Sequence, residues 1–267
     1  MILSALYRYP VKSVQAQSLQ ACAVGSMGLE GDRRWMVVEA DNGRFLTQRA
    51  WTGLGLIHAD YLADGSLLLA AAGRAPLQVA VPPADEALRG VTIWRDTLRV
   101  PDAGDEAAAW LSELLGKPVR LVHCPAPRAR YLPSGYGLAS DRAAFPDGFP
   151  LLLIGQASLD ELSRRVGRPM QMLRFRPNLV VEGAEAFAED QWKRIRIGAM
   201  TLRVLKPSVR CILTTLDPAT GERSPDREPL TTLKTFREKE GDVLFGQNLA
   251  VDGEGELQVG MAVEVLE

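Results

Sequence analysis

Short apolar runs separated by turn residues make up most of the first hundred residues. The runs are rich in β-branched, aromatic and leucine side chains, and Gly, Pro, Asn and Asp separate them, as in "DNG" at 41–43 and "ADG" at 63–65. This pattern predicts β-strands, and several short strands at close spacing indicate a barrel or a sandwich. The expected strands are "ILSALYRYPV", "RRWMVVEA", "SLLLAA", "LQVAV" and "VTIWRDTLRV".

The spacing of apolar residues changes to a helical one near residue 102. In "DAGDEAAAWLSELLGKP" the acidic residues come early, the apolar residues follow at helical spacing, and Gly116 supplies the stop. A second helix is expected at "SLDELSRRVG", where Ser158 and Glu161 form a capping box and Gly167 closes the helix. Both segments predict helices of about three turns.

Strand-like runs return after the second helix. The "DGEG" at 252–255 predicts a hairpin turn between the last two of these runs. The chain is therefore expected to be mainly β with a few helices, and the best boundary lies near residue 120. We expect a β-barrel-like domain at 1–120 and a second β-barrel domain at 121–267. The later runs are "NLVVEG", "QWKRIRIG", "TLRVLKP", "DVLFGQNLAV" and "ELQVGMAVEVLE".

Composition and charge exclude several functional classes. The 267 residues carry a net charge of −2, so nothing predicts affinity for nucleic acid or an anionic membrane surface. No run approaches the roughly 20 apolar residues that span a bilayer, and the N-terminus does not resemble a signal peptide. Three widely spaced cysteines argue against a disulfide framework. We expect a cytoplasmic protein without membrane insertion.

The familiar catalytic motifs are missing. There is no GxxxxGK[ST], no GxSxG and no HExxH, and "GYGLAS" at 135–140 lacks the context of a dinucleotide-binding turn. Two histidines make a multi-histidine metal site improbable, and three cysteines cannot supply the four thiolates of an iron–sulfur cluster. The usual hydrolase and dehydrogenase chemistries are poorly supported.

Cys211, in "TLRVLKPSVRCILTT", is the first candidate for chemistry. We expect Lys206-Pro207 to break the preceding strand, so that Cys211 opens the next apolar run. A free cysteine is most often a small buried hydrophobe. The guanidinium of Arg210 beside it would instead favour a thiolate, which is a soft metal ligand or a nucleophile. The residues alone leave packing and binding both open.

The segment "RFRPN", residues 174–178, is the second candidate. If it is extended, Arg174 and Arg176 point to one face and Phe175 to the other. Two forked cations, with Asn178 just beyond, suit recognition of an anion such as phosphate. A solvated edge strand with two surface arginines explains the same pattern equally well.

Three weaker motifs complete the set. "YPVKS" places Lys12 and a hydroxyl after the first strand, "GLEGDRRW" delivers Arg33 from a glycine turn, and the glycine of "FGQN" suggests a bulge or a closely approaching ligand. Each is unspecific alone. Together they describe a thiolate among cations and amides, which suits a soft metal held within a large anionic organic cofactor.

These motifs, in this order, resemble those of MOSC-domain proteins with their N-terminal β-barrel domain. In particular, the chain resembles the mitochondrial amidoxime-reducing component and its bacterial YcbX relatives. The resemblance covers nearly the whole chain and rests on five short segments: "YPVKS", "GDRRW", "FRPN", "RCILTTLDPATGE" and "LFGQN".

The resemblance implies a molybdenum cofactor, in which a phosphorylated pterin carries the metal through a dithiolene. Cys211 matches the cysteine that coordinates molybdenum and takes part in catalysis in the amidoxime reducers. The implied cofactor-binding residues are Lys12, Ser13, Arg33, Ser158, Arg176, Asn178, Val209, Arg210 and Asn248. At Asn248 the mitochondrial relatives carry an aromatic hydroxyl, so the contact there is expected to differ.

The implied function is reduction of N-hydroxylated compounds (amidoximes, hydroxylamines and N-hydroxylated bases) by a molybdenum-containing oxidoreductase. Many bacterial relatives continue into a C-terminal 2Fe-2S ferredoxin domain that this sequence does not show. We therefore expect electrons from a separate ferredoxin, flavoprotein or cytochrome-type protein. One alternative is a molybdenum cofactor or sulfur carrier that uses Cys211 without turnover. Another is a barrel that binds single-stranded nucleic acid, which the acidic pI of about 5.9 disfavours.

Overall fold

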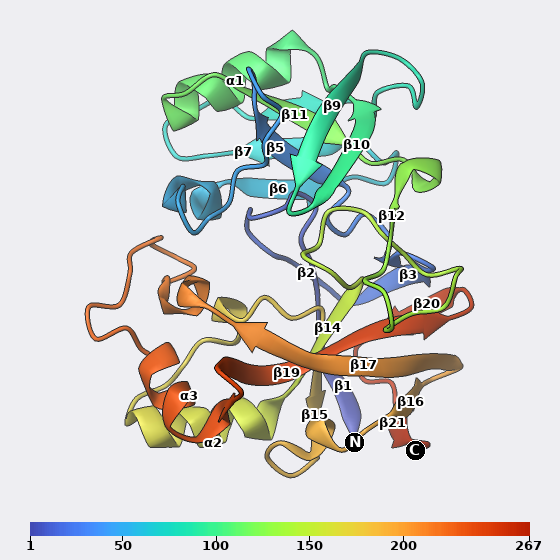
Figure 1. Ribbon diagram of the computed structural model, residues 1–267, viewed down its shortest axis with the longest axis vertical. Helices are drawn as coiled ribbons and strands as arrows, with labels where there is room; N and C mark the ends of the chain where they lie inside the picture. Colours follow the sequence, from blue (N-terminus) through green and yellow to red (C-terminus); the bar gives the residue numbers. More distant parts are fainter.

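The computed structural model describes all residues from 1 to 267 and contains two lobes stacked along its long axis (Figure 1). The upper lobe in that view holds the small sheets of the first half of the chain together with α1. The lower lobe holds one large sheet flanked by α2 and α3, and both chain ends lie at its lower edge. The fold is mainly β with three α-helices, as the sequence predicts.

A nine-stranded sheet forms the lower lobe. Its strands run in the order β2-β1-β15-β14-β19-β17-β16-β21, and β18 pairs with β19. The pair β14 and β15 is parallel and α2 connects the two strands, whereas the other pairs of the sheet are antiparallel. The bounds are β1 (Ile2–Arg8), β2 (Gln17–Leu19), β14 (Leu151–Gly155), β15 (Leu179–Glu182), β16 (Arg194–Ile197), β17 (Met200–Arg210), β18 (Glu238–Lys239), β19 (Asp242–Asp252) and β21 (Val263–Val265).

Smaller sheets form the upper lobe and its junction with the lower one. In the upper lobe β5 (Trp35–Glu39) pairs with β11 (Val119–His123), β9 (Leu88–Ile93) with β10 (Asp96–Pro101), and β6 (His58–Tyr61), β7 (Leu67–Ala70) and β8 (Leu77–Val79) form a third sheet. At the junction β12 (Arg130–Tyr131) pairs with β13 (Arg142–Ala143), while β3 (Ala21–Gly25) lies between β4 (Gly28–Leu29) and β20 (Gly255–Gln258).

The helices are short. They are α1 (Asp105–Leu115), α2 (Gln156–Val166) and α3 (Leu230–Arg237), with 3₁₀ turns η1 (Thr52–Leu56), η2 (Ala126–Arg128), η3 (Met172–Arg174), η4 (Ala188–Asp190) and η5 (Ile212–Thr215). Gly116 and Gly167 end the first two helices in the left-handed region, as predicted, because glycine has no Cβ to clash there. None of the helices combines the length and apolar character that crossing a membrane requires.

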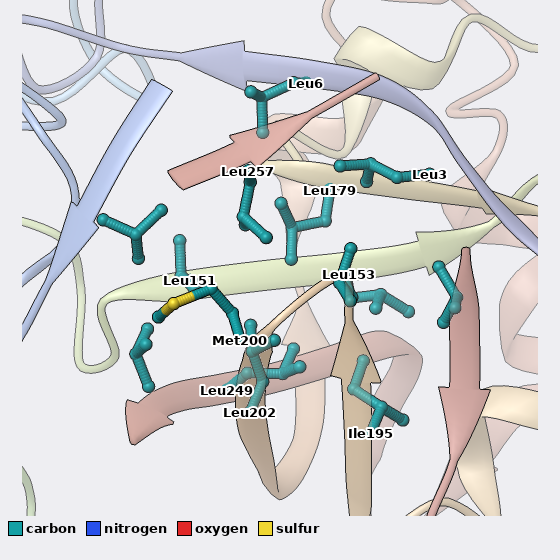
Figure 2. Packing of buried hydrophobic residues seen from close by; sticks show 14 of the residues in the cluster. Leu3, Leu6, Leu151, Leu153, Leu179, Ile195, Met200, Leu202, Leu249 and Leu257 are labelled. Carbon is teal, nitrogen blue, oxygen red and sulfur yellow. The ribbon is translucent and has the colours of Figure 1, made fainter. Parts of the chain in front are cut away.

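Separate hydrophobic clusters stabilise the two lobes. The largest contains 18 buried residues on the inner faces of the nine-stranded sheet and of β3 and β20. Figure 2 shows its centre, where Leu3, Leu153 and Leu202 converge from strands that are far apart in sequence. A cluster of 15 residues fills the upper lobe beneath α1, and a cluster of nine lies between the large sheet, α2 and α3.

Two local predictions are wrong. The capping box is absent, because α2 begins at Gln156 and Ser158 lies inside its first turn. The hairpin predicted at 252–255 does not form either, since β20 pairs with β3 rather than with β19. Both edges of β19 are already paired, with β14 and with β17, and pairing with β3 buries Leu257 in the main cluster.

The lower lobe is built from both ends of the chain. The first strand, β1, pairs with β15, and β3 pairs with β20, so roughly the first thirty residues contribute to sheets made otherwise by the C-terminal half. The domain boundary near residue 120 remains a prediction. The crossing of the chain between lobes is what brings N-terminal and C-terminal motifs together.

Candidate functional site

A cavity of about 290 Å³ collects nine of the ten predicted site residues. Its 23 lining residues include seven cationic side chains and a single carboxylate, so the cavity is strongly electropositive in a protein of almost neutral net charge. The predicted residues that line it are Lys12, Ser13, Arg33, Arg176, Asn178, Val209, Arg210, Cys211 and Asn248. Ser158 is the exception.

Cys211 lies directly after the last residue of β17, half-buried at the cavity wall. The predicted strand break at Lys206-Pro207 is wrong, because β17 continues to Arg210 and absorbs the proline between two register shifts in its pairing with β19. Cys211 itself has an extended backbone and its carbonyl accepts hydrogen bonds from Thr214 N and Oγ1. A strand end therefore presents the thiol on a fixed backbone.

Arg210 places part of its guanidinium in the cavity without a protein partner. Its Nε donates to Phe245 O at 2.7 Å and its Nη1 donates to Phe175 O at 3.0 Å, while Nη2 is buried and unpartnered. Burial lowers the pKa of Arg210 to about 9, against the opposing effect of the neighbouring Cys211. Gly246, with a φ of +75°, makes this approach possible, since a Cβ there would lie 3.2 Å from Nη2 and 2.7 Å from Leu153 O.

The segment 174–178 is not extended, contrary to prediction. Met172–Arg174 form η3, and Arg176 adopts a left-handed φ of +56°. The turn still sends Phe175 into the core and both arginines to the cavity. The guanidinium of Arg176 makes no hydrogen bond to the protein, lies 4.2 Å from the centre of the Tyr9 ring, and leaves Nη2 buried and unpartnered. Burial lowers the pKa of Arg176 to about 10.

Asn178 positions Arg33. Its Oδ1 accepts from Arg33 Nη1 at 3.1 Å and from Leu152 N at 3.2 Å, and its Nδ2 donates to Tyr7 O at 3.1 Å. The amide is therefore used within the protein, and Asn178 is 0% exposed. Arg33 also donates to Asp32 and to Arg176 O, which fixes the relative position of the two arginines.

Lys12 is buried in the cavity wall beside Asp147. Its ammonium donates to Phe145 O at 2.9 Å and to the Asp147 carboxylate, which also accepts from Trp94 Nε1 and pairs with Arg49. Burial lowers the pKa of Lys12 to about 8, although Asp147 opposes the change. Ser13 follows with a left-handed φ of +67° at the same wall.

Val209 and Asn248 form the rim contributed by the two long strands. Val209 is 43% exposed, which is high for a valine, and it faces the opening of the cavity. Asn248 donates from Nδ2 toward the carbonyls of Lys206 and Pro207, at 3.4 and 3.3 Å, and so supports the irregular part of β17.

Ser158 lies outside the cavity, in the first turn of α2. Its hydroxyl donates to Glu189 Oε2 at 2.8 Å and accepts from Phe187 N at 2.7 Å, and the residue is 0% exposed. Both hydrogen-bonding capacities are satisfied by the protein. The geometry is that of a structural hydroxyl that fixes the turn around Glu189.

Four further charged residues line the cavity but are absent from the set predicted for the site: Arg49, Asp147, Arg174 and Lys206. Arg174 was visible in the sequence as the first arginine of "RFRPN", but its Nη2 donates to Asp217 at 3.0 Å. Asp217 in turn accepts from the backbone of Ala219 and Thr220, which makes it the organiser of the following turn. Arg49 and Asp147 gave no signal, since single charges in loops are common.

The arrangement can bind an anion and, through one thiol, a soft metal. No group of three or more His, Cys, Asp or Glu side chains that could hold a metal ion is present. Cys211 is thus a single protein ligand within a ring of cations, three of which, all arginines, have a buried N–H group without a partner. Unpartnered buried donors are rare in folded proteins and mark places where a ligand supplies the acceptor.

Comparisons with known proteins find relatives over nearly the whole chain. The mitochondrial amidoxime-reducing component 1 of Xenopus laevis is 32% identical over 278 residues, covering 97% of this chain and 80% of that protein. The mitochondrial amidoxime reducing component 2 of Rattus norvegicus is 34% identical over 277 residues, covering 97% and 81%. The molybdenum cofactor sulfurase of Oryza sativa subsp. japonica is 30% identical over 289 residues, covering 98% of this chain and 34% of that protein.

Family models match both halves of the chain. The MOSC N-terminal beta barrel domain matches residues 1–118, and the MOSC domain matches residues 140–264. The two matches together take in every residue that the sequence predicted for the site. The chain therefore belongs to the family of MOSC-domain proteins that carry the MOSC N-terminal beta barrel domain, together with the mitochondrial amidoxime-reducing components.

Proposed function

We propose that this protein is a molybdenum-cofactor-dependent oxidoreductase that reduces N-hydroxylated compounds to the corresponding amines or amidines. The relatives named above are amidoxime-reducing components and a molybdenum cofactor sulfurase, which supports a function linked to that cofactor. The observation that carries the proposal is the pair of buried, unpartnered Nη2 atoms of Arg176 and Arg210 beside the half-buried thiol of Cys211.

The residues present fit a phosphorylated, sulfur-ligated metal cofactor. Cys211 would supply the protein ligand to molybdenum, and Lys12, Arg176 and Arg210 would neutralise the phosphate and the pterin edge. Asn178 would act indirectly, by holding Arg33 in place. When bound, the molybdenum centre supplies the two-electron redox chemistry that side chains cannot perform.

The protein's own part is to bind, orient and supply protons. Reduction of an N-hydroxylated amine consumes two electrons and two protons and releases water. The Lys12 ammonium holds a proton at Nζ within the wall, and its lowered pKa makes that proton easier to release at neutral pH. The electrons would come from a separate ferredoxin, flavoprotein or cytochrome-type protein.

A second candidate is a carrier of the cofactor or of sulfur. The 30% identity to a molybdenum cofactor sulfurase favours it, since a cysteine in an open cationic cavity could also hold a persulfide or a stored cofactor. In that case Cys211 would transfer its cargo to another protein without turnover. The cytoplasmic location and the absence of nucleic-acid binding remain predictions for either candidate.

Metal analysis combined with a turnover assay separates these functions. We expect near-stoichiometric molybdenum in the purified protein and reduction of benzamidoxime by a chemical reductant. Cys211→Ala should lose both, whereas Cys22→Ala, which removes a thiol from the main hydrophobic cluster, should retain both. Stable molybdenum without turnover on benzamidoxime or a hydroxylamine would favour the carrier. Absence of molybdenum after expression in a cofactor-producing host would refute the reductase and the cofactor carrier and would leave only the sulfur carrier.

A further inference from the structure

Another cavity, of about 740 Å³, adjoins the cavity of the candidate site. It lies between the tip of the β9–β10 hairpin, residues 94–98, and the segment 129–134, and we call it the hairpin cavity. The hairpin tip points toward the junction of the two lobes (Figure 1). Asp147 lines both cavities. Its Oδ1 accepts from Lys12 Nζ on one side and from Trp94 Nε1, at 3.2 Å, on the other.

Trp94 occupies a backbone position that normally favours glycine. Ile93 pairs with Asp96, so Trp94 and Arg95 form a two-residue turn, and Trp94 has a φ of +54°. Glycine or asparagine usually takes such a position, because a Cβ is unfavourable there. The side chain is nevertheless 43% exposed, so burial does not explain the choice of tryptophan. A strained residue that burial does not explain indicates a role in binding.

Two aromatic rings stand on opposite segments of the hairpin cavity. Trp94 contacts the edge of the Phe45 ring, with ring centres 5.0 Å apart, and the Arg49 guanidinium lies 4.9 Å from its own ring centre. Tyr131 is 69% exposed, and the Arg142 guanidinium lies 3.8 Å from the centre of its ring. Each ring is therefore held by a neighbouring cation while much of its surface stays available to a ligand.

The hairpin cavity differs in charge from the cavity that contains Cys211. Two arginines and two carboxylates line it, whereas seven cations and one carboxylate line the other. Asp96 is paired with Arg130 at 2.8 Å, and Asp147 is paired with Lys12. The hairpin cavity thus suits an uncharged ligand, and its aromatic walls favour a flat ring.

We propose that the hairpin cavity is the subsite for the aromatic ring of an N-hydroxylated substrate, and that Trp94 determines the preference for aromatic substrates. This inference rests on the proposed function. The cavity that contains Cys211, at about 290 Å³, lies at the lower limit for small-molecule sites, so a phosphorylated pterin leaves little room there for the body of a substrate. The small N–O group would reach past Asp147 toward Cys211, while the ring packs against Trp94 and Tyr131.

Kinetics with two amidoximes test this subsite. Benzamidoxime carries a phenyl ring where acetamidoxime carries a methyl group, and a chemical reductant can supply the electrons for both. Trp94→Gly should raise KM for benzamidoxime roughly tenfold and change KM for acetamidoxime less than twofold. The kcat values should change little, because the ring contact is shared by ground state and transition state.

Three further variants separate the ring of Trp94 from its other contacts. Trp94→Phe keeps a ring but loses the hydrogen bond to Asp147, and it should restore most of the affinity for benzamidoxime. Tyr131→Ala should weaken benzamidoxime in the same selective way. Trp110→Ala is the matched control, because it removes an indole that donates to Ala75 O outside both cavities.

A binding measurement makes the test independent of turnover. Benzamidoxime should bind the purified full chain without reductant at one molecule per chain, and Trp94→Gly should weaken this binding roughly tenfold, as isothermal titration calorimetry would show. Glycine favours the backbone of residue 94, so the turn should be kept, and urea unfolding checks this. Such binding without any turnover would refute the reductase and retain the subsite.

Three results would overturn the subsite. The first is that Trp94→Gly changes neither the KM nor the binding of benzamidoxime. The second is that it weakens both amidoximes by the same factor, which would mean that Trp94 acts only through Asp147. The third is that benzamidoxime does not bind saturably at millimolar concentration.

Discussion

Cys124 and Cys211 both lie beside arginines, yet their surroundings in the fold differ. Cys124 is 0% exposed and packs in the cluster that contains Val122 and Phe145. Its neighbour Arg34 donates Nε to the Cys124 carbonyl at 2.9 Å. Arg130, nearby, donates to the carbonyls of Ala144 and Pro146 and to Asp96. In this region every arginine has protein acceptors, and burial raises the pKa of the Cys124 thiol to about 11.

The region around Cys211 has the opposite character. The thiol is half-buried at a cavity, and the adjacent Arg210 and the nearby Arg176 each keep one buried N–H group without an acceptor. Two arginines with lowered pKa values are costly to the folded protein unless a ligand pairs with them. The difference teaches that an arginine next to a cysteine is not a functional signal by itself. The signal is an arginine that lines a cavity and that the fold leaves without an acceptor there.

Alkylation rates should separate the two thiols most strongly. Without cofactor, Cys211 should react with iodoacetamide at pH 8 roughly a thousandfold faster than Cys124, because the buried thiol reacts only when the upper lobe opens. Mass spectrometry of tryptic peptides over time measures both rates in one sample. Phosphate or bound cofactor should slow the reaction at Cys211 alone.

Denatured protein supplies the control for this measurement. In urea the two cysteines should react at similar rates, since neither burial nor neighbouring charges persist there. Comparable rates for Cys124 and Cys211 in the folded protein would show that the cavity does not expose the thiol, and the proposed function would lose its metal ligand.

Substitution of one arginine in each region should change stability in opposite directions. Arg130→Met should lower the free energy of unfolding by about 3 kcal/mol, because it leaves buried acceptors without donors. Arg176→Met should raise it by about 1 kcal/mol in cofactor-free protein, because the guanidinium there has only the Tyr9 ring as a partner. Urea unfolding followed by fluorescence measures both changes.

The same two variants differ in the expected effect on the cofactor. Arg176→Met should reduce molybdenum content, whereas Arg130→Met should retain it in the fraction that folds. A destabilised Arg176→Met protein would mean that the guanidinium has a structural role. The arginines around Cys211 would then not differ from those around Cys124.

Much of the fold was predictable because it depends on local pattern. The strand-rich composition, the helix that ends at Gly116 and the bulge at Gly246 all follow from residue types and spacing. Which strands pair with each other could not be predicted from residue types and spacing. The turn at 252–255 has the chemistry of a hairpin, but β19 has no free edge, and this fact depends on strands 40 to 100 residues away.

The site was predictable as a set of motifs, and less so as a set of contacts. Arg174 and Arg176 reach the cavity as expected, but through a 3₁₀ turn and a left-handed residue instead of an extended strand. The role of Asn178 could not be deduced either, because its partners Arg33 and Tyr7 belong to the other end of the chain. The buried Nη2 atoms of Arg176 and Arg210 have no hydrogen-bond partner, and no sequence pattern could have predicted this.

Lys12 is a cavity cation that, unlike Arg176, has protein acceptors for its hydrogen bonds. The pH dependence of stability tests how burial affects it. Burial lowers the pKa of Lys12 to about 8, against about 10.4 in an unfolded chain. Between these values the unfolded chain binds more protons than the folded one, so the stability contributed by this residue rises with pH. From pH 7.5 to 9.5, wild type should gain about 2 kcal/mol relative to Lys12→Met. Parallel pH profiles of stability for the two proteins would contradict the lowered pKa of Lys12 in the folded protein.

Phosphate binding provides a second readout at Lys12. The cationic form is lost as the pH rises through about 8, so affinity for inorganic phosphate should fall there in wild type. Lys12→Met should bind more weakly at pH 7 and lose this step in the profile. A bound anion favours the charged ammonium, which moves the step to higher pH and makes it detectable as proton uptake.

Substitution of Ser158 should have the smallest effect of these variants. It compares a hydroxyl whose hydrogen bonds are all made within the protein with the arginine N–H groups that have no partner. The resemblance places it near the cofactor, but its hydroxyl is fully used by Glu189 and Phe187. Ser158→Ala should therefore lower the free energy of unfolding by about 1–2 kcal/mol, because the buried Glu189 carboxyl loses a donor and Phe187 N loses an acceptor. Molybdenum content per folded chain should not change, as metal analysis after size exclusion would show. Loss of molybdenum from a variant of normal stability would instead place Ser158 in the cofactor site, and a satisfied hydroxyl would then have to exchange its partners when the ligand binds.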